Sequence, residues 1–175
     1  MKRLFYSLIV AAVALLPVAC EKETVPNTGD KTGKLYGTWV LDTKNVDYVY
    51  TVGDKTNTTT ETTDFTGDHF MLKLSDILIA FAQKGSIFTF DIDDVDSTPY
   101  TYNANLNQIS FREAISLSTG FLPAKFMTLF GTYDVVQLTK DTLVLKQVDE
   151  ALFNSYSSTR TTVYSYHKLI VEDED

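Results

Sequence analysis

The chain has 175 residues and carries 15 Lys and Arg against 23 Asp and Glu, which gives a formal net charge of -8. This acidic balance argues against nucleic-acid binding, because phosphate backbones bind to basic surfaces. Aromatic residues make up 13% of the chain, which is too many for a disordered protein. A single Cys excludes both an intrachain disulfide and a metal site built from several Cys. The composition therefore indicates one folded domain with a short additional segment.

Residues 1–19 have the pattern of an export signal. Lys2 and Arg3 precede a mostly apolar run of thirteen residues, Leu4 to Leu16. A membrane-spanning helix needs roughly 20 residues, so this run is too short for one. A basic start, a short apolar stretch and a small residue before a cleavage site are typical of a signal peptide. We therefore expect this segment to direct export and to be removed.

The only Cys lies at the end of this run, in Leu16-Pro17-Val18-Ala19-Cys20. This segment resembles the lipobox of bacterial lipoproteins, in which the thiol is lipidated and the signal is cut just before the Cys. It departs from the commonest lipobox at Pro17, because Leu16 lies one position too early. The resemblance implies that removal of 19 of the 175 residues leaves 156, with Cys20 acylated and held on a membrane.

Two alternatives stay open for residues 1–19: an ordinary signal peptide that happens to be followed by a Cys, and a marginal membrane anchor.

Glu21 to Lys34 contains one aliphatic residue, Val25, and no aromatic residue, so it cannot form a core. We expect residues 20–34 to be a flexible tether with an end-to-end distance on the order of 20 Å. Lipidation implies a location in the cell envelope, at the outer membrane, on its periplasmic or its surface face.

From Leu35 onward apolar and polar residues mostly alternate, which is typical of β-strands. The Thr-rich segment Thr56 to Thr66 fits either an edge strand or a loop. A total of eight or nine short strands is typical of a small closed barrel. We predict an all-β, antiparallel barrel of about eight strands over residues 35–171, followed by an acidic tail at 172–175. The clearest strands are Leu35–Leu41, Val46–Val52, Ser86–Ile92, Tyr100–Tyr102, Ile109–Phe111, Thr132–Leu138, Leu143–Val148 and Thr161–Val171.

Two segments have helical spacing instead. In Asp68 to Lys84 apolar residues recur every three or four positions, with Asp68 placed to cap the start and Gly85 to end the helix. In Leu122 to Phe130 the apolar residues also share one helical face, and Pro123 suits a first helical turn. We therefore expect one or two short helices inserted between strands, where they would plug one mouth of the barrel or cover it.

Three motifs resemble a known family. Gly37-Thr38-Trp39 on the first expected strand resembles the Gly-x-Trp signature of lipocalins. The hairpin Tyr133–Leu138 with Leu143–Leu145, and the last strand Tyr164–Leu169, are similar to those of lipocalin-like lipoproteins of Bacteroidetes. The resemblance implies a lipocalin-like barrel and carries no ligand with it.

The chain departs from lipocalins at the last strand. Lipocalins usually stack an Arg of that strand over the signature Trp as a cation–π contact. Tyr164 to Val171 contains no Arg, so Lys168 or Arg160 replaces it, or the barrel floor is built differently.

Candidate catalytic and metal-binding residues are few. Asp91, Asp93, Asp94 and Asp96 lack the Gly and the distal Glu of a calcium loop, so we interpret them as a solvated turn. His69 and His167 lie 98 positions apart, and no Ser or Cys nucleophile lies in an activating context. We predict no metal, no cofactor and no enzyme activity. A two-carboxylate hydrolase stays open as the alternative, because the separation of carboxylates in space is not visible in a sequence.

Aromatic residues at alternating strand positions would face the interior of a closed barrel. A barrel of eight strands has room for side chains or for one small ligand, and Tyr suits amphipathic ligands. We expect non-covalent binding of a small apolar or amphipathic molecule, with core packing as the alternative role of each residue. A second hypothesis is an accessory module whose outer face, or the helix Asp68–Lys84, docks on another envelope protein. The candidate ligand-binding residues are Trp39, Tyr48, Tyr50, Phe88, Phe90, Tyr100, Tyr102, Tyr133, Tyr164 and Tyr166.

Overall fold

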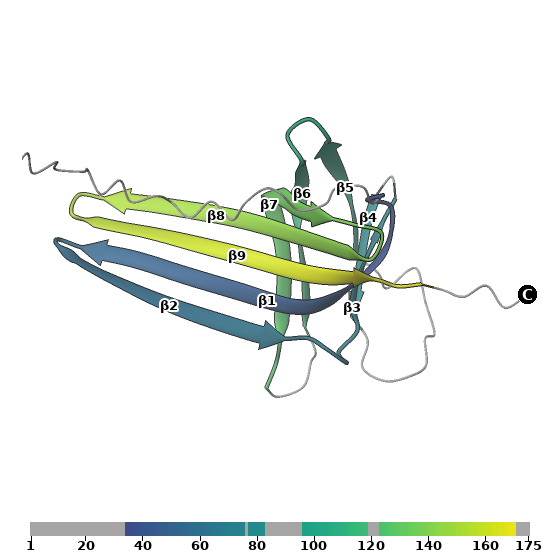
Figure 1. The fold of residues 1–175 in the computed structure, drawn as a ribbon, viewed down its shortest axis with the longest axis horizontal. Coiled ribbons are helices and arrows are strands. Elements are labelled where there is room, and N and C mark those ends of the chain that lie inside the picture. The colour runs from purple at the N-terminus through teal and green to yellow at the C-terminus, as the bar shows by residue number, and fades with distance from the viewer. Residues whose placement is uncertain (1–33, 76, 83–95, 119–122, 171–175) are drawn as a thin grey trace, which may run out of the picture.

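The computed structural model describes residues 34–75, 77–82, 96–118 and 123–170, and every statement below concerns this part of the chain. It is all-β, as predicted, and the described residues form no helix with the length and apolar character needed to cross a bilayer. The strands, labelled in Figure 1, are β1 Gly37–Val52, β2 Lys55–Asp64, β3 Phe70–Leu74, β4 Ile77–Ala82, β5 Asp96–Asn103, β6 Gln108–Ser118, β7 Phe126–Leu138, β8 Thr142–Phe153 and β9 Tyr156–Lys168.

These strands form one antiparallel sheet in the order β2-β1-β3-β4-β5-β6-β7-β8-β9. β1 also pairs with β9, from Trp39 opposite Lys168 to Val52 opposite Tyr156, and this pairing closes the sheet in a ring. β1 pairs with β3 only at its start, through residues 37–40, and with β2 through residues 43–52. The ring therefore passes through every described strand except β2, which branches from the second half of β1.

Four strands continue beyond the ring as a sheet with two open edges (Figure 1). They pair in the order β2-β1-β9-β8, and Asp47 of β1, opposite both Thr60 and Thr161, marks where this part begins. The last residue of β8 that pairs with β7 is Lys146, opposite Asp134. We call residues 47–60 and 148–161 the extension.

The core occupies the inside of the ring and ends where the extension begins. In β8, Leu143 and Leu145 are fully buried, whereas residues 148–153 are all exposed. Among the described residues, no buried side-chain nitrogen or oxygen lacks a hydrogen-bond partner. The buried cluster consists of Leu35, Trp39, Leu41, Phe65, Phe70, Leu72, Leu74, Leu78, Ile109, Phe111, Ile115, Met127, Leu129, Tyr133, Val135, Leu138, Leu143, Leu145, Tyr164 and Tyr166.

The expected helix at Asp68–Lys84 is wrong, because its described residues form β3 and β4, joined by a turn after Leu74. Phe70, Met71 and Leu72 are consecutive buried side chains. A short continuous apolar run fits a strand buried on both faces as well as it fits a helix. His69 has φ of 51°, in the left-handed region, which a helix starting at Asp68 would not tolerate.

The expected helix at Leu122–Phe130 is also wrong. Residues from Phe126 onward belong to β7, where the buried Met127 and Leu129 alternate with the exposed Thr128 and Phe130. Alternation of this kind puts successive side chains on opposite faces of a sheet. The apolar residues that would share one helical face here include the exposed Phe126 and Phe130, so their spacing does not predict which side chains are buried.

The expected strands Tyr100–Tyr102 and Ile109–Phe111 are confirmed and pair as the hairpin β5–β6. The expected strands Thr132–Leu138 and Leu143–Val148 are also confirmed, and they pair as the hairpin β7–β8. The Thr-rich segment is the edge strand β2, and Gly53-Asp54 forms its turn. The two strands expected at Leu35–Leu41 and Val46–Val52 are one long strand with an irregularity between Leu41 and Thr43. The expected strand Ser86–Ile92 lies outside the described residues.

Candidate functional site

Four of the candidate ligand-binding residues are part of the buried core. Trp39, Tyr133, Tyr164 and Tyr166 are each at most 2% exposed. The three Tyr rings form a series in which Tyr133 lies 6.1 Å from Tyr164, and Tyr164 lies 6.3 Å from Tyr166, between ring centroids. The Tyr164 hydroxyl donates to the backbone oxygen of Thr128 at 2.8 Å. All four side chains belong to the buried cluster inside the ring.

The other candidates lie elsewhere. Tyr100 and Tyr102 are half-buried at the end of the ring where β1 starts. Tyr48 and Tyr50 lie on the extension, outside the core cluster. The remaining candidates lie outside the described residues; they are Phe88, Phe90 and the expected lipidation residue Cys20.

A cation does lie over the signature Trp. The Nζ atom of Lys168 is 5.1 Å from the centroid of the Trp39 ring, and it also donates to the backbone oxygen of Tyr36 at 3.1 Å. The Trp39 indole N–H donates to the backbone oxygen of Leu35 at 2.8 Å. Arg160, the other candidate, lies 5.9 Å from the Tyr48 ring instead. The last strand therefore supplies this contact with a Lys.

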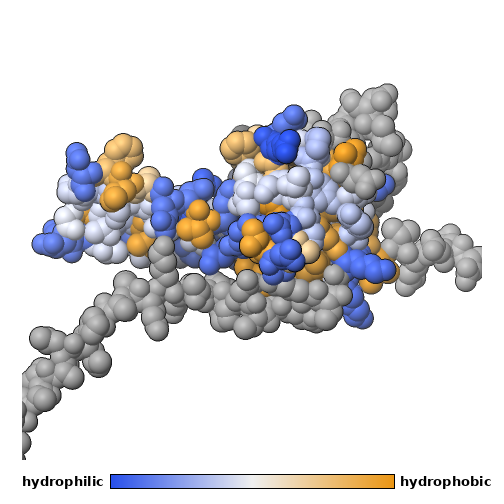
Figure 2. Space-filling model, turned by 90° about the horizontal axis from the view of Figure 1, so that it is seen from above, coloured by the Kyte–Doolittle hydropathy of each residue, from blue (hydrophilic) through white to orange (hydrophobic). Residues whose placement is uncertain are grey.

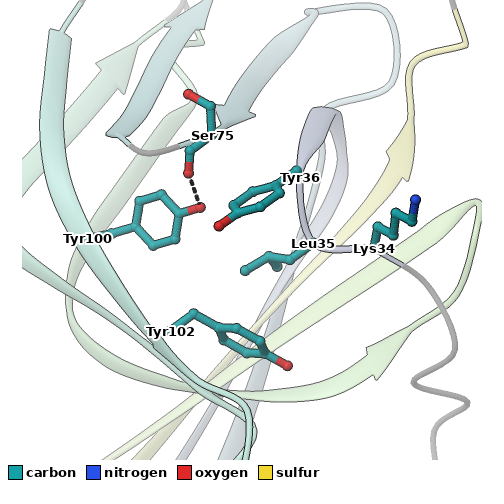
Figure 3. A pocket seen from close by; sticks show the side chains of 6 residues that line it. All are labelled: Lys34, Leu35, Tyr36, Ser75, Tyr100 and Tyr102. Atoms are coloured by element: carbon teal, nitrogen blue, oxygen red, sulfur yellow. Dashed lines mark hydrogen bonds between the residues drawn. The ribbon is translucent and has the colours of Figure 1, made fainter.

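A cleft of about 520 Å³ opens at the end of the ring beside Leu35. Figure 3 shows Tyr36, Tyr100 and Tyr102 around it, with Lys34 at its edge. Tyr100 and Tyr102 are two positions apart on β5 and so project from the same face of the strand. The Tyr100 hydroxyl donates to the backbone oxygen of Ser75 at 2.5 Å, which ties β5 to the β3–β4 turn. We call this cleft the tyrosine cleft.

A second cavity, of about 380 Å³, lies where β7 separates from β8 at the base of the extension. One wall is the first half of β7, and the other is the face of β1, β9 and β8 that continues from the ring interior. The Gln147 side-chain amide donates to the backbone oxygen of Phe130 at 2.8 Å and bridges the two walls. We call this cavity the cationic pocket. It is lined by Lys44, Thr128, Phe130, Tyr133, Gln147, Asp149, Arg160, Thr162 and Tyr164.

The cationic pocket has distinctive electrostatics. Burial lowers the pKa of Lys44 most strongly, repulsion from Arg160 lowers it further, and Glu61 opposes both effects. Burial raises the pKa of Tyr133 and of Tyr164. Lys44 lies over the Tyr164 ring, 5.9 Å from its centroid. Within the described residues neither Lys44 nor Arg160 forms an ion pair with a carboxylate.

The histidines lie apart from both cavities. His167 Nδ1 is 2.6 Å from Asp42 Oδ1, in an exposed pair that joins β9 to β1. The described part of the chain holds no cluster of three or more His, Cys, Asp or Glu that fits a metal ion. Asp91, Asp93 and Asp94 lie outside that part.

Sequence reasoning did not single out Lys44, Gln147 or Asp149. Lys44 lies on β1, whereas Gln147 and Asp149 lie two positions apart on β8. Only the pairing of β1 with β9 and of β9 with β8 brings the two strands to one cavity. One signal in the sequence could have indicated Lys44, because it alternates with Val46 and Tyr48 along the strand. These three positions continue the inward face of Trp39 and Leu41 beyond the irregularity in β1. Comparison with protein-family models, curated proteins and solved structures gave no significant match.

Proposed function

We propose that the chain is a lipid-anchored, lipocalin-like protein of the cell envelope that binds a small amphipathic molecule in the tyrosine cleft and catalyses no reaction. The observation that carries this proposal is a cleft of about 520 Å³ lined by three Tyr side chains. Small-molecule sites typically have volumes of about 300–1,000 Å³ and are lined by aromatic side chains with a few polar groups. The interior aromatic residues pack in the core, so the end of the ring is the better site.

The residues of the cleft define the chemistry of its ligand. Tyr36 and Tyr102 offer flat apolar rings with polar tips, and Leu35 adds an aliphatic side chain. Lys34, at the edge, offers a positive charge. A ligand with an apolar or aromatic body and an acidic group satisfies all three features.

The expected tether ends at the cleft, because Lys34 is its last residue and lines the cavity. If Cys20 is acylated, the fourteen residues from Glu21 to Lys34 span on the order of 20 Å. The cleft would then lie within reach of the lipid surface, where amphipathic molecules collect. Metabolic labelling with a fatty-acid probe tests the anchor, since it should tag the wild type and not Cys20→Ser.

Ligand binding is tested with the anionic, aromatic dye 1-anilinonaphthalene-8-sulfonate and the purified full chain. Tyr36→Ala and Tyr102→Ala together remove two of the three rings, and we expect at least a tenfold loss of dye affinity. The matched control is Phe126→Ala, which removes an exposed ring at the start of β7, outside both cavities. Equal dye affinity in the wild type, the double variant and the control contradicts the proposal. Native mass spectrometry of the protein from its own host then identifies the natural ligand by its mass.

A second candidate function, an accessory module that docks on another envelope protein, is favoured by the extension. Val52, Tyr156 and Phe153 are neighbours across three strands and are 54%, 39% and 71% exposed. Figure 2 shows hydrophobic groups among the hydrophilic surface of this part. Exposed apolar patches of this kind mark interaction sites. The version of this hypothesis that used a helix at Asp68–Lys84 is wrong, because β3 and β4 occupy that segment.

Docking is tested with a photo-crosslinking residue at position 153 of the chain expressed in its own host. We expect one protein to be captured at a fixed ratio. The same residue at position 140, in the exposed turn between β7 and β8, should capture none. Identical capture patterns from the two positions count against docking through the extension.

A further inference from the structure

The cationic pocket brings two positive side chains to one face of the sheet. Tyr164 is opposite Lys44, and Arg160 is opposite Tyr48, so the two cations are separated by one intervening pair, Val46 and Thr162. The fact that Arg160 lowers the pKa of Lys44 shows that their charges act on each other. Both side chains line the same cavity.

The carboxylates around the pocket do not pair with these cations. Asp149 lines the cavity and is opposite Arg160 on β8, and Glu61 is opposite Val46 on β2. Neither forms an ion pair with Lys44 or Arg160 in the described part of the chain. The lining therefore contains two cations and one carboxylate, while Glu61 acts on Lys44 from outside the lining.

Neutral hydrogen-bond donors complete the lining. The Tyr133 hydroxyl accepts from the Phe130 backbone N–H at 3.4 Å, and it donates no hydrogen bond to the described residues. The Thr162 hydroxyl and the Gln147 amide lie in the same cavity. Phe130, which is 57% exposed, adds an apolar wall. These groups suit an anion carried on a small organic body.

We propose that the cationic pocket binds a phosphoryl group, with Arg160 and Lys44 as its cationic ligands and the Tyr133 hydroxyl as a neutral donor. A phosphate monoester carries a charge of about -1.5 to -2, which matches the two cations. The planar guanidinium of Arg can donate two parallel hydrogen bonds to a phosphate, and the ammonium of Lys supplies a point charge. This site lies at the base of the extension and is separate from the tyrosine cleft.

The first test is titration of the purified full chain with inorganic phosphate, followed by calorimetry and by the NMR signal of the Lys44 side chain. We expect Arg160→Gln to weaken phosphate binding at least tenfold. Asp149→Asn should strengthen it several-fold, because it removes the opposing charge. The matched control Lys140→Gln, at an 89% exposed side chain, should change nothing. Phosphate should also raise the pKa of Lys44, since an anion stabilises the ammonium form.

A merely structural role for Arg160 predicts no change in phosphate binding for Arg160→Gln or Asp149→Asn, and that result overturns the proposal. Absence of binding up to about 20 mM phosphate also overturns it. Because Arg160 is exposed, Arg160→Gln should keep the unfolding temperature of the wild type. Glycerol 3-phosphate and vesicles that contain phosphatidic acid distinguish a free phosphate ester from a lipid headgroup as the source. Binding of glycerol 3-phosphate or of these vesicles supports the proposed site if Arg160→Gln abolishes that binding.

Discussion

Lys168 lies across the Trp39 ring because residue 37 is a glycine. A Cβ atom at position 37 would be 2.7 Å from Cε of Lys168, closer than real Cβ contacts, and Gly37 has φ of 139°. The Lys168 ammonium then reaches both the Trp39 ring and the backbone oxygen of Tyr36. The first and third residues of the Gly-x-Trp motif thus have linked roles, since one makes room for the cation that the other binds.

We expect Gly37→Ala to lower the free energy of unfolding by about 1–3 kcal/mol, because an L residue rarely adopts a φ of 139° and because the end of the Lys168 side chain must move away from the Trp39 ring. Urea unfolding measures the change. In the background of Lys168→Ala there is no Lys168 contact with Trp39 to displace, so the same substitution should lower the free energy of unfolding by less. The matched control is Gly53→Ala, where φ is 57° and no atom lies within 4 Å of the new Cβ, so only the backbone cost applies. Equal costs in both Lys168 backgrounds would show that displacement of Lys168 contributes nothing.

A second prediction concerns the cation itself. Lys168→Arg keeps a positive charge over the Trp39 ring, whereas Lys168→Met keeps most of the side-chain volume and removes the charge. We expect Lys168→Met to cost about 0.5–2 kcal/mol of unfolding free energy and Lys168→Arg to cost less. Because Trp39 is the only Trp, its fluorescence reports this site directly. If Lys168→Met and Lys168→Arg have the same free energy of unfolding, the cation–π contact with Trp39 does not stabilise the fold.

The sequence predicts a structural feature well when the residues that form it are close together in the chain. The β5–β6 and β7–β8 hairpins were predictable because their turns lie between short alternating segments. The run Phe70-Met71-Leu72 was not, since it is apolar on both faces of its strand. The pair formed by Asp42 and His167 joins residues 125 positions apart, which no local pattern shows.

The extension and the cationic pocket were missed for a related reason. Residues 148–153 of β8 are exposed on both faces, so burial imposes no alternation on them. Lys44 and Arg160 meet only because β1 closes on β9, and the register of that pairing is a property of the whole ring. Single residue types could be proposed from the sequence, but their grouping into two cavities could not.

Alkaline pH should destabilise the protein. Burial raises the pKa of Tyr133, Tyr164 and Tyr166 in the folded state above the ordinary value of about 10. Above that pH the unfolded chain loses these protons and the folded chain keeps them, so the folded state binds more protons and stability falls as pH rises. The contribution is complete below about pH 10 and is lost as pH approaches the folded-state pKa values. Urea unfolding at about pH 8, 10 and 11 measures the slope.

Tyr166→Phe provides the control for this pH dependence. It removes the fully buried hydroxyl, whose contact is a 3.7 Å hydrogen bond to the Met127 sulfur. We expect the alkaline slope to become shallower in this variant, while Tyr36→Phe, at a 63% exposed ring, keeps the wild-type slope. An unchanged slope in Tyr166→Phe would assign the alkaline loss to other groups.

The ion pair between Asp68 and Lys125 should stabilise the fold. It joins the turn before β3 to the residue before β7, and Asp68 is only 8% exposed. Asp68→Asn leaves a charged hydrogen bond broken in a poorly solvated place, and we expect it to cost about 1.5–3 kcal/mol in urea unfolding. The exposed pair between Lys140 and Asp141 is the control, because Asp141→Asn should leave stability nearly unchanged. Similar costs for the two substitutions would mean that burial of the first pair does not matter.

The two halves of β8 should contribute very differently to stability. Leu145 is fully buried in the ring, whereas Leu152 on the extension is 77% exposed. Leu145→Ala removes packed methyl groups and leaves a cavity, so we expect a loss of about 2–5 kcal/mol of unfolding free energy. Leu152→Ala makes the same chemical change on an exposed surface and should cost no more than about 0.5 kcal/mol. A cost at Leu152 close to that at Leu145 would show that the extension is covered in solution, by a second copy of the chain or by another part of it. If Leu152→Ala has a negligible effect on the free energy of unfolding, and position 153 still captures its partner in this variant, the exposed side chains of the extension serve binding and not folding.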